Sequence, residues 1–344
     1  MVVFKTKPQL VTKSKYVKEK YIVSNIEEGL KLVVDKFGNE AEKPFILTGD
    51  DVTVSILDEH YDELKDKFYF FNAGEAGRVK HFMNKDVVCD LAAKHGFNIP
   101  KTWKVSNGNI PNDLEYPVFI KAVNSFGKEW KEIVSVCNDE KDLREAYKNI
   151  KSDEVIIQKY IEKIDEQGCE GFSVNKGKDI FFSVWNREAY HLPKQYAPVW
   201  HNSNPTNEEF IQKASAMIEE IGFEGVFEFE FMVGKDNHLY FLEINFRNTV
   251  NGWETTCAGM PGITLWCESM LQNKIVDNCY CEIPDGFYTM AECFDYDVRV
   301  KGNILSHREW MKEYKNANAK LYRGRNDFMP FFSFMLYKFW HMRK

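Results

Sequence analysis

The sequence has no excess of positive charge: 45 lysine and arginine residues face 52 aspartate and glutamate residues, for a formal net charge of −7. Nucleic-acid-binding surfaces normally show a basic stripe, so this balance argues against nucleic acid as a partner. The eight cysteines form no Cys-x-x-Cys pair and no Cys/His cluster with zinc-site spacing. The N-terminus also lacks the apolar stretch of a secretory signal peptide. We therefore expect a cytoplasmic protein with reduced thiols.

Sequence motifs of several common enzyme classes are missing as well. There is no GxxxxGK[ST] motif for a phosphate-binding P-loop, and no Ser/His/Asp or Cys/His set that we can defend as catalytic. The uncharged aromatic run at residues 328–337 is far shorter than the roughly 20 residues that a membrane span needs. What remains is a chain of 344 residues with 44% hydrophobic and 28% charged residues, typical of a globular protein with two or three domains.

The most informative stretch is residues 225–247. Two runs of alternating apolar residues flank the turn sequence at 234–237, which predicts a β-hairpin. In the first run the phenylalanines share one face, while Glu228 and Glu230 share the other. Like charges that face one another on a sheet are destabilising, so we expect a positive charge beside these two carboxylates.

The second strand of the hairpin continues the acidic face with Glu243, Asn245 and Arg247. Carboxylate and amide oxygens form an all-oxygen set, which suits Mg²⁺ better than zinc or a soft metal. Arg247 lies two residues beyond Asn245 and is placed to contact a phosphate held by the metal. The alternative is a hairpin whose acidic face merely points at water. We favour the metal site, because asparagine and arginine continue the acidic face in register.

The first 100 residues alternate short apolar runs with segments of helical periodicity. Residues 26–37 repeat apolar side chains at helical spacing and end before Gly38, and Ser24 with Glu27 matches a capping box at their start. Strands that alternate with helices predict an α/β domain with a partly parallel sheet.

Three weaker features precede the hairpin. Lys121 ends a buried strand, and such a lysine is usually a surface group that extends to solvent. The loop with Gly127 and Lys128 follows, and a single glycine is a weak indication of a phosphate cradle. A buried strand at 155–162 then ends in polar residues from Gln158 onward. Each feature has an ordinary structural explanation, and only their order along the chain gives them weight.

Several short segments carry that order. They are residues 43–50 (KPFILTGD), Asn84-Lys85, residues 96–100 (GFNIP), residues 117–121, residues 158–161, Arg187 six residues before Pro193, Glu230, residues 243–247 (EINFR) and residues 327–330. The order resembles the ATP-grasp superfamily of carboxylate–amine ligases over nearly the whole chain, and most of all the branch of D-aspartate ligase-like and carbamoyl-phosphate-synthase-like proteins. Phe246 departs from the family, which commonly has proline there, and the opening strand and glycine-rich turn look shortened.

The resemblance implies an α/β (α+β) ATP-grasp fold in which two subdomains clasp ATP between their sheets. Residues 1–100 would form a pre-ATP-grasp α/β domain, 101–185 the central subdomain, 186–300 the C-terminal subdomain with the metal site, and 301–344 a helical tail.

The resemblance also implies ATP and Mg²⁺ (or Mn²⁺) as cofactors and assigns roles to single residues. Glu230, Glu243 and Asn245 would bind the metal, and Arg247 and Arg187 would be catalytic. The implied ATP-binding set is Lys85, Lys121, Lys128, Gln158, Lys159, Tyr160, Ile161, Asp165 and Glu166. Within this set the lysines would hold phosphates, backbone groups at 159–161 the adenine, and Asp165 or Glu166 the ribose.

The implied reaction is an amide or peptide bond formed through an acyl phosphate, with release of ADP and phosphate. The substrates would be a small carboxylate and an amine, such as an amino acid or a cell-envelope precursor. Two alternatives are a metal-dependent glycosyltransferase that uses Asp295-Tyr-Asp297, and a scaffold that keeps the fold without turnover. The sequence leaves open whether the protein forms a homodimer. For the aromatic tail at 327–344, a packed terminal helix is favoured over an interfacial helix on a membrane.

Overall fold

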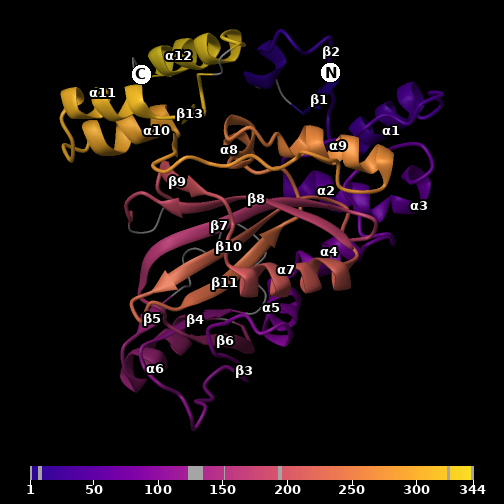
Figure 1. The fold of residues 1–344 in the computed structure, drawn as a ribbon. Coiled ribbons are helices and arrows are strands. Elements are labelled where there is room, and N and C mark those ends of the chain that lie inside the picture. Colours follow the sequence, from indigo (N-terminus) through magenta and orange to yellow (C-terminus); the bar gives the residue numbers. More distant parts are fainter. Residues whose placement is uncertain are drawn as a thin grey trace. The chain divides into compact units, whose positions relative to one another are not determined.

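The structure, a computed structural model, describes residues 2–6, 10–122, 135–150, 152–192, 196–323 and 326–341. Its contacts group into two compact units (Figure 1). The first unit combines residues 1–96, 165–231 and 242–344, and the second unit combines residues 97–164 and 232–241. The predicted division at residues 100, 185 and 300 stays a prediction, and its boundary at 185 falls within strand β8 (Asp179–Glu188).

The N-terminal part of the first unit is mainly helical. Its elements are β1 (Val2–Lys5), the 3₁₀ turn η1 (Leu10–Lys13), β2 (Glu19–Ile22), α1 (Ile26–Phe37), α2 (Asp51–Glu59), α3 (Tyr61–Leu64), α4 (Arg78–Phe82) and α5 (Lys85–Lys94). Within the described residues, the predicted parallel sheet is limited to the pair β1–β2 and a single parallel bridge between Phe45 and Tyr69.

Helix α1 confirms the predicted helix but begins one residue later than the predicted cap implies. The Asn25 side chain accepts a hydrogen bond from the Glu28 N–H, while the Ser24 N–H donates to the Glu28 carboxylate. The N-cap is therefore Asn25, with the Glu28 carboxylate bonded to the preceding residue, and the prediction of a capping box by Ser24 and Glu27 was wrong by one position. Asparagine caps helices as well as serine does, so the sequence allowed both positions.

The centre of the first unit is a seven-stranded sheet with the order β11-β10-β7-β8-β9-β12-β13. The strands are β7 (Lys163–Val174), β8, β9 (Val199–Ser203), β10 (Gly225–Gly234), β11 (Leu239–Asn245), β12 (Tyr288–Met290) and β13 (Ala319–Lys320). Neighbours β7, β8 and β9 pair antiparallel, with Gly168 opposite Asn186 and Asn186 opposite Asn202. The tip of the β10–β11 hairpin and the start of β7 belong to the second unit.

Helix α7 (Glu208–Ile221) covers one face of this sheet (Figure 1). Phe210 of this helix contacts Trp185 of β8 and Phe229 and Phe231 of β10, with ring centroids 4.9, 5.8 and 5.7 Å apart. The segment with α8 (Gly252–Cys257) and α9 (Gly262–Gln272) packs on the opposite face, where Val184 of β8 joins a buried cluster with Ala258 and Met260. The two faces of the sheet are therefore covered by different parts of the chain.

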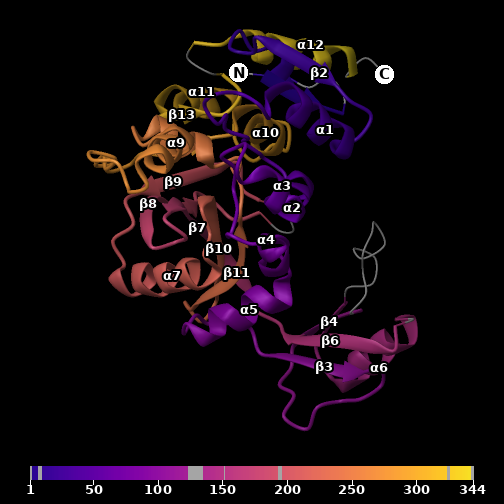
Figure 2. The ribbon, with the colours of Figure 1, turned by 90° about the vertical axis from the view of Figure 1, so that its right-hand side faces the viewer.

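The C-terminal part of the first unit, from Glu292 onward, adds further helices. They are α10 (Glu292–Asp295), the π-helical turn η3 (Tyr296–Val300), α11 (His307–Asn316) and α12 (Met329–His341). Trp310 of α11 packs in a cluster with Val199 of β9 and Met290 of β12. Helix α12 lies against η1, and Figure 2 shows it beside β2. Across the described residues, no helix combines the length and apolar character that a membrane crossing requires.

The second unit contains a four-stranded antiparallel sheet with the order β3-β6-β4-β5. Its elements are β3 (Thr102–Ser106), β4 (Val118–Ala122), β5 (Ser135–Cys137), α6 (Glu140–Asn149) and β6 (Glu154–Lys159). The buried strand predicted to end at Lys121 is present as β4, and the strand predicted at 155–162 is present as β6, which ends three residues earlier, at Lys159. A core that includes Ile120, Leu143 and Ile157, each fully buried, holds α6 on the sheet.

Candidate functional site

The predicted hairpin at residues 225–247 is present as β10 and β11. The Gly234 N–H donates to the His238 carbonyl oxygen at 3.0 Å, and Asn237 adopts the left-handed backbone conformation that asparagine tolerates in tight turns. Phe227 and Phe229 are fully buried on the face covered by α7. This burial leaves the acidic side chains of β10 for the other face.

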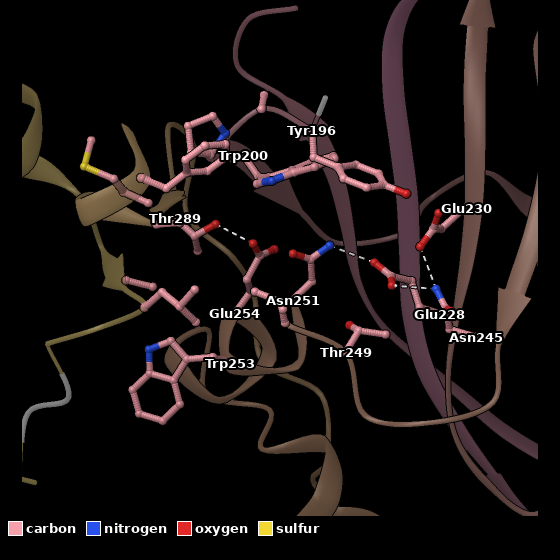
Figure 3. Close-up of a pocket in the computed structure, with 18 of the residues that line it drawn as sticks. Tyr196, Trp200, Glu228, Glu230, Asn245, Thr249, Asn251, Trp253, Glu254 and Thr289 are labelled. Carbon is pink, nitrogen blue, oxygen red and sulfur yellow. Dashed lines mark hydrogen bonds between the residues drawn. The ribbon is translucent and has the colours of Figure 1, made fainter. Parts of the chain in front are cut away.

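The side-chain amide of Asn245 connects the residues of the acidic face to one another by hydrogen bonds. Asn245 Nδ2 donates to Glu230 Oε1 at 2.5 Å and to Glu228 Oε2 at 3.3 Å, while Asn245 Oδ1 accepts from Arg247 Nη2 at 3.0 Å (Figure 3). Asn245 and Glu228 are 8% and 3% exposed. The structure therefore brings Asn245 together with Glu228, Glu230 and Arg247, which the alternation of residues predicted to share one face.

Burial makes this face electrostatically unfavourable when no cation is bound. Burial, together with the nearby Glu228 and Glu243 carboxylates, raises the pKa of Glu230 to about 8. Burial also raises the pKa of Glu228. Among the described residues, no three His, Cys, Asp or Glu side chains are grouped as a ready metal site. The predicted ligand set contains two carboxylates and an amide oxygen, and this all-oxygen, electron-rich group fits a hard divalent cation.

Two ion pairs join the hairpin to distant parts of the chain. Lys85, the first residue of α5, lies with its Nζ 2.6 Å from Glu243 Oε2. Arg247 Nε lies 2.5 Å from Asp51 Oδ1 at the start of α2. The Lys85 side chain is 65% exposed, so its ion pair is weakly held and can be exchanged for a phosphate. Arg247 is 21% exposed and is bonded on two sides, which fixes its guanidinium.

Most of the other predicted ATP ligands lie in the second unit. Gln158 and Lys159 are at the end of β6, which pairs with β4, the strand that contains Lys121. Gln158 Nε2 donates to Thr102 Oγ1 at 2.8 Å. The N–H groups of Lys159 and Tyr160 donate to the carbonyl oxygens of residues 101 and 117 at 2.8 and 3.0 Å, so these two donors are already used. Lys128 lies outside the described residues.

Two predicted site residues are bound to each other in the first unit. Arg187 Nε lies 2.6 Å from Asp165 Oδ2, and Gln167 Nε2 donates to the same oxygen at 3.1 Å. Asp165 is buried, whereas the Arg187 side chain is 63% exposed. The neighbouring Glu166 is half-buried. The structure thus shows Arg187 in an ion pair, and its catalytic role stays a prediction.

Sequence reasoning missed a second layer of polar residues beneath the hairpin. Thr249 Oγ1 donates to Glu170 Oε1 at 2.6 Å, and Asn251 Nδ2 donates to Glu228 Oε1 at 2.7 Å. Burial and the neighbouring Glu228 raise the pKa of Glu170 well above its ordinary value. The sequence offered one indication that Thr249 and Asn251 belong to the site: they lie in the segment 248–251, which follows the hairpin directly.

Glu254 of α8 was missed too. It is 5% exposed, and its Oε1 accepts from Thr289 Oγ1 at 2.5 Å (Figure 3). Its Oε2 accepts from Asn202 Nδ2. Burial raises its pKa to about 8. Glu254 lies over β9 and β12, whereas Glu228 lies on β10, so buried carboxylates are present along much of this face.

The Asp295-Tyr-Asp297 sequence does not form the metal site that a glycosyltransferase would need. Asp295 is fully buried, and Arg299 donates to both of its oxygens at 2.8 Å. Trp310 Nε1 donates to Asp295 Oδ2 at 2.7 Å, and the Tyr190 hydroxyl donates to Oδ1. Because these donors occupy the carboxylate, Asp295 joins α10, η3 and α11 and has a structural role.

A cavity of about 330 Å³ lies over the acidic face, within the first unit. Glu228, Glu230 and Asn245 line it on the hairpin side, and Trp253 and Thr289 line it on the other side (Figure 3). Lys85 and Arg187 are not among the residues that line it. The cavity therefore continues from the candidate metal ligands toward β12 and β13.

Comparison with known proteins identifies the family. The family model for the carbamoyl-phosphate synthase L chain ATP-binding domain matches residues 89–261. The N5-carboxyaminoimidazole ribonucleotide synthase of Staphylococcus aureus (strain COL) is 29% identical over 133 residues, which are 38% of this chain and 34% of that protein. The alpha subunit of mitochondrial methylcrotonoyl-CoA carboxylase from Dictyostelium discoideum is 28% identical over 144 residues, 39% of this chain and 20% of that protein. The aligned part thus spans about a third or less of these relatives.

Solved structures show the same fold. An S. aureus N5-carboxyaminoimidazole synthetase complexed with ADP has a TM-score of 0.61 at 17% identity and covers 89% of this chain and 79% of its own. The L-amino acid ligase of Bacillus licheniformis has a TM-score of 0.54 at 16% identity, with 74% and 64% covered. The biotin carboxylase domain of Hydrogenobacter thermophilus 2-oxoglutarate carboxylase, a dimer with MgADP and bicarbonate, has a TM-score of 0.56 at 17% identity, with 79% and 64% covered.

These matches confirm the predicted ATP-grasp fold and the predicted cofactors of the family, ATP and Mg²⁺. The family match begins within α5 and ends after α8, so it includes the whole acidic hairpin and the polar segment that follows it. The chain belongs to the family of the carbamoyl-phosphate synthase L chain ATP-binding domain, among the ATP-grasp carboxylate–amine ligases.

Proposed function

We propose that this chain is an ATP- and Mg²⁺-dependent carboxylate–amine ligase that forms an amide or peptide bond through an acyl phosphate. The observation that carries the proposal is the buried acidic face of the β10–β11 hairpin, on which Asn245 joins Glu228, Glu230 and Arg247. The guanidinium of Arg247 is also paired with Asp51, and burial still raises the pKa values of Glu228 and Glu230, so a purely structural role would leave a cost that a bound cation relieves.

The residues of the hairpin have distinct roles in this proposal. Glu230, Glu243 and the Asn245 amide oxygen would hold Mg²⁺, which supplies positive charge to the β- and γ-phosphates. Lys85 would exchange its exposed contact with Glu243 for a phosphate oxygen as the metal site fills. Arg247, oriented by Asp51 and Asn245, would contact the transferring phosphoryl group.

The proposed reaction needs no nucleophile from the protein. A substrate carboxylate attacks the γ-phosphate of ATP, giving an acyl phosphate and ADP, and an amine then displaces inorganic phosphate. The protein contributes orientation and electrostatic stabilisation. The adenine, ribose and remaining phosphate contacts at Lys121, Lys128, 158–161 and 165–166 belong to this proposal as well.

The products test the proposal directly. Incubation with ATP, Mg²⁺, a carboxylate and an amine is expected to release ADP and inorganic phosphate. A carboxylate labelled with ¹⁸O should transfer one labelled oxygen to the released phosphate, because that oxygen bridges the acyl phosphate. Release of AMP and pyrophosphate, or phosphate without label, would contradict the acyl-phosphate route. The Glu230→Gln variant serves as the inactive control, and Glu219→Gln, an exposed residue of α7, as the matched active one.

A further inference from the structure

The cavity over the acidic face has an aromatic and apolar wall that binding of ATP and a metal does not require. Four of the chain's exposed large hydrophobic residues line it: Tyr196, Val250, Trp253 and Phe294, with 60, 66, 36 and 37% exposure. Isolated surface hydrophobics are common, but a group of them around one cavity marks a binding surface.

The part of this wall that contains Trp253 and Phe294 lies near the edge of the sheet opposite the hairpin, whereas Tyr196 lies beside Glu230 (Figure 3). Met290 of β12 is 1% exposed, and Phe294 follows it on α10. Trp253 of α8 is oriented by a hydrogen bond from its Nε1 to the carbonyl oxygen of Lys320 in β13, at 3.1 Å. A ligand would therefore meet aromatic surfaces that are already in place, which limits the entropy lost on binding.

Carboxyl groups continue along the cavity beyond the candidate metal ligands. Glu228 and Glu254 also line it. The guanidinium of Arg247 also lines the cavity, but it is paired with Asp51. A ligand that extends from the hairpin toward Trp253 passes these carboxyl groups (Figure 3). Their oxygen atoms can accept hydrogen bonds from an ammonium group, so an amino group is favoured there.

We propose that the amine-bearing substrate of this site combines an amino group with a bulky apolar group, as hydrophobic amino acids do, and that Trp253 and Phe294 hold the apolar group. The inference rests on the proposed function, which requires an amine. The cavity volume of about 330 Å³ lies at the lower end for small-molecule sites, which suits a single amino acid better than a long peptide.

Binding measurements on the full chain with saturating MgADP test the inference without turnover. Calorimetry is expected to give phenylalanine and leucine affinities about tenfold or more above those of glycine and aspartate, because the apolar contact is lost in the small and polar amino acids. Phenethylamine should also bind more tightly than 3-phenylpropanoate, which has no amino group. Equal affinities for glycine and phenylalanine, or tighter binding of 3-phenylpropanoate, would overturn the inference.

Variants locate the binding to this cavity. Phe294→Ala should weaken phenylalanine binding by about tenfold and leave glycine binding unchanged. Leu271→Ala on α9, a residue with 64% exposure outside the cavity lining, is the matched control and should change neither. Trp253→Phe keeps an aromatic ring and should bind phenylalanine better than Trp253→Ala does. Loss of phenylalanine binding in Leu271→Ala alone would place the apolar site elsewhere.

The inference and the proposed function can fail separately. If phenylalanine binds as expected but no carboxylate and amine together release phosphate from ATP, the ligase proposal fails and the binding preference stands. If phosphate release is as fast with glycine as with phenylalanine as the amine, the ligase proposal stands and the preference for an apolar amine is overturned.

Discussion

The two faces of strand β10 have opposite effects on the fold. On the face toward α7, Phe229 and Phe231 contact Phe210 and are almost completely buried. On the other face, Glu228 and Glu230 are held in a low-dielectric environment that raises the pKa of each. The phenylalanines lower the free energy of the folded state, whereas the carboxylates raise it. The comparison teaches that alternation along a single strand can separate the residues that stabilise a protein from those that bind its ligands.

The largest expected effect is on the phenylalanine face. Phe229→Ala should lower the free energy of unfolding by about 3–5 kcal/mol, because the loss of a buried ring leaves a cavity. Urea denaturation measures the change. Phe332→Ala on α12, where the ring is 58% exposed, is the matched control and should change stability by about 0.5 kcal/mol or less. Similar losses in both variants would show that β10 is not the centre of the core.

Substitutions on the acidic face should impair turnover and not stability. Glu230→Gln and Glu243→Gln should reduce turnover by about 10²–10³, as the loss of a preorganised electrostatic contact does in other enzymes. Without ligands, both variants should be as stable as the original chain or more stable, since repulsion between carboxylates is relieved. Steady-state kinetics measures the turnover, and urea denaturation measures the free energy of unfolding. A marked loss of stability would mean that the carboxylates are structural.

Glu254, a further carboxylate buried on the acidic side of the sheet, should make the free energy of unfolding depend on pH. Its pKa rises from 4.5 to about 8 on folding because of burial, so between these values the folded state holds a proton that the unfolded state has lost. Stability should therefore fall as pH rises from about 5 to 8, by up to roughly 1.4 kcal/mol per pH unit for this group. Glu254→Gln should remove this part of the slope, and Glu219→Gln should not. Parallel stability curves for both variants would contradict the assignment.

Substitutions of Arg247 and Lys121 distinguish a role in the transition state from a role in nucleotide binding. Arg247→Ala should lower kcat by roughly 10² with little change in ATP affinity, because the guanidinium is assigned to the transferring phosphoryl group. Lys121→Ala should weaken ATP binding instead. Asp51→Asn, which removes the partner of Arg247, should lower kcat less than Arg247→Ala does. Calorimetry and kinetics distinguish the patterns, and the reverse pattern would exchange the two roles.

The smallest expected effect concerns helix α12. The aromatic ring of Phe334 stacks on Tyr322 at 4.7 Å, which favours a packing role, while Phe332 and Leu336 are 58 and 60% exposed. The full chain is expected to remain in the soluble fraction with anionic liposomes, and a truncation that ends at Asp327 should aggregate. If the full chain floats with the vesicles while the truncation stays soluble and active, the membrane interpretation is correct.

The hairpin could be predicted from the sequence because each of its signals is local. A period of two fixes which side chains share a face, and the residues at 234–237 fix the turn. Lys85 was reached only through the family resemblance. Its contact with Glu243 joins residues that are more than 150 positions apart, and no periodicity encodes such a contact.

The layer beneath the hairpin could not be predicted in this way. Glu170 and Glu254 meet the site only after α8 packs on the sheet, and an isolated glutamate in a strand or a short helix is usually at the surface. The parallel sheet expected in the first 100 residues was overestimated for a related reason. In the short apolar run at residues 45–47, Phe45 and Ile46 are half-buried, Leu47 is exposed, and the pairing is a single bridge from Phe45. A short apolar run does not by itself show whether a strand forms.

The division of the chain into units has a consequence for how this protein can be taken apart. The second unit draws residues 97–164 from one stretch and 232–241 from the tip of the hairpin. Asn98 forms a bridge with Tyr240, and the Lys235 N–H donates to the Glu162 carbonyl oxygen at 2.9 Å. A fragment made of residues 97–164 alone would therefore expose the surfaces that the hairpin tip covers. Neither unit can be cut out of the gene as one uninterrupted segment, so insertions, fusions and domain exchanges must leave the β10–β11 connection intact.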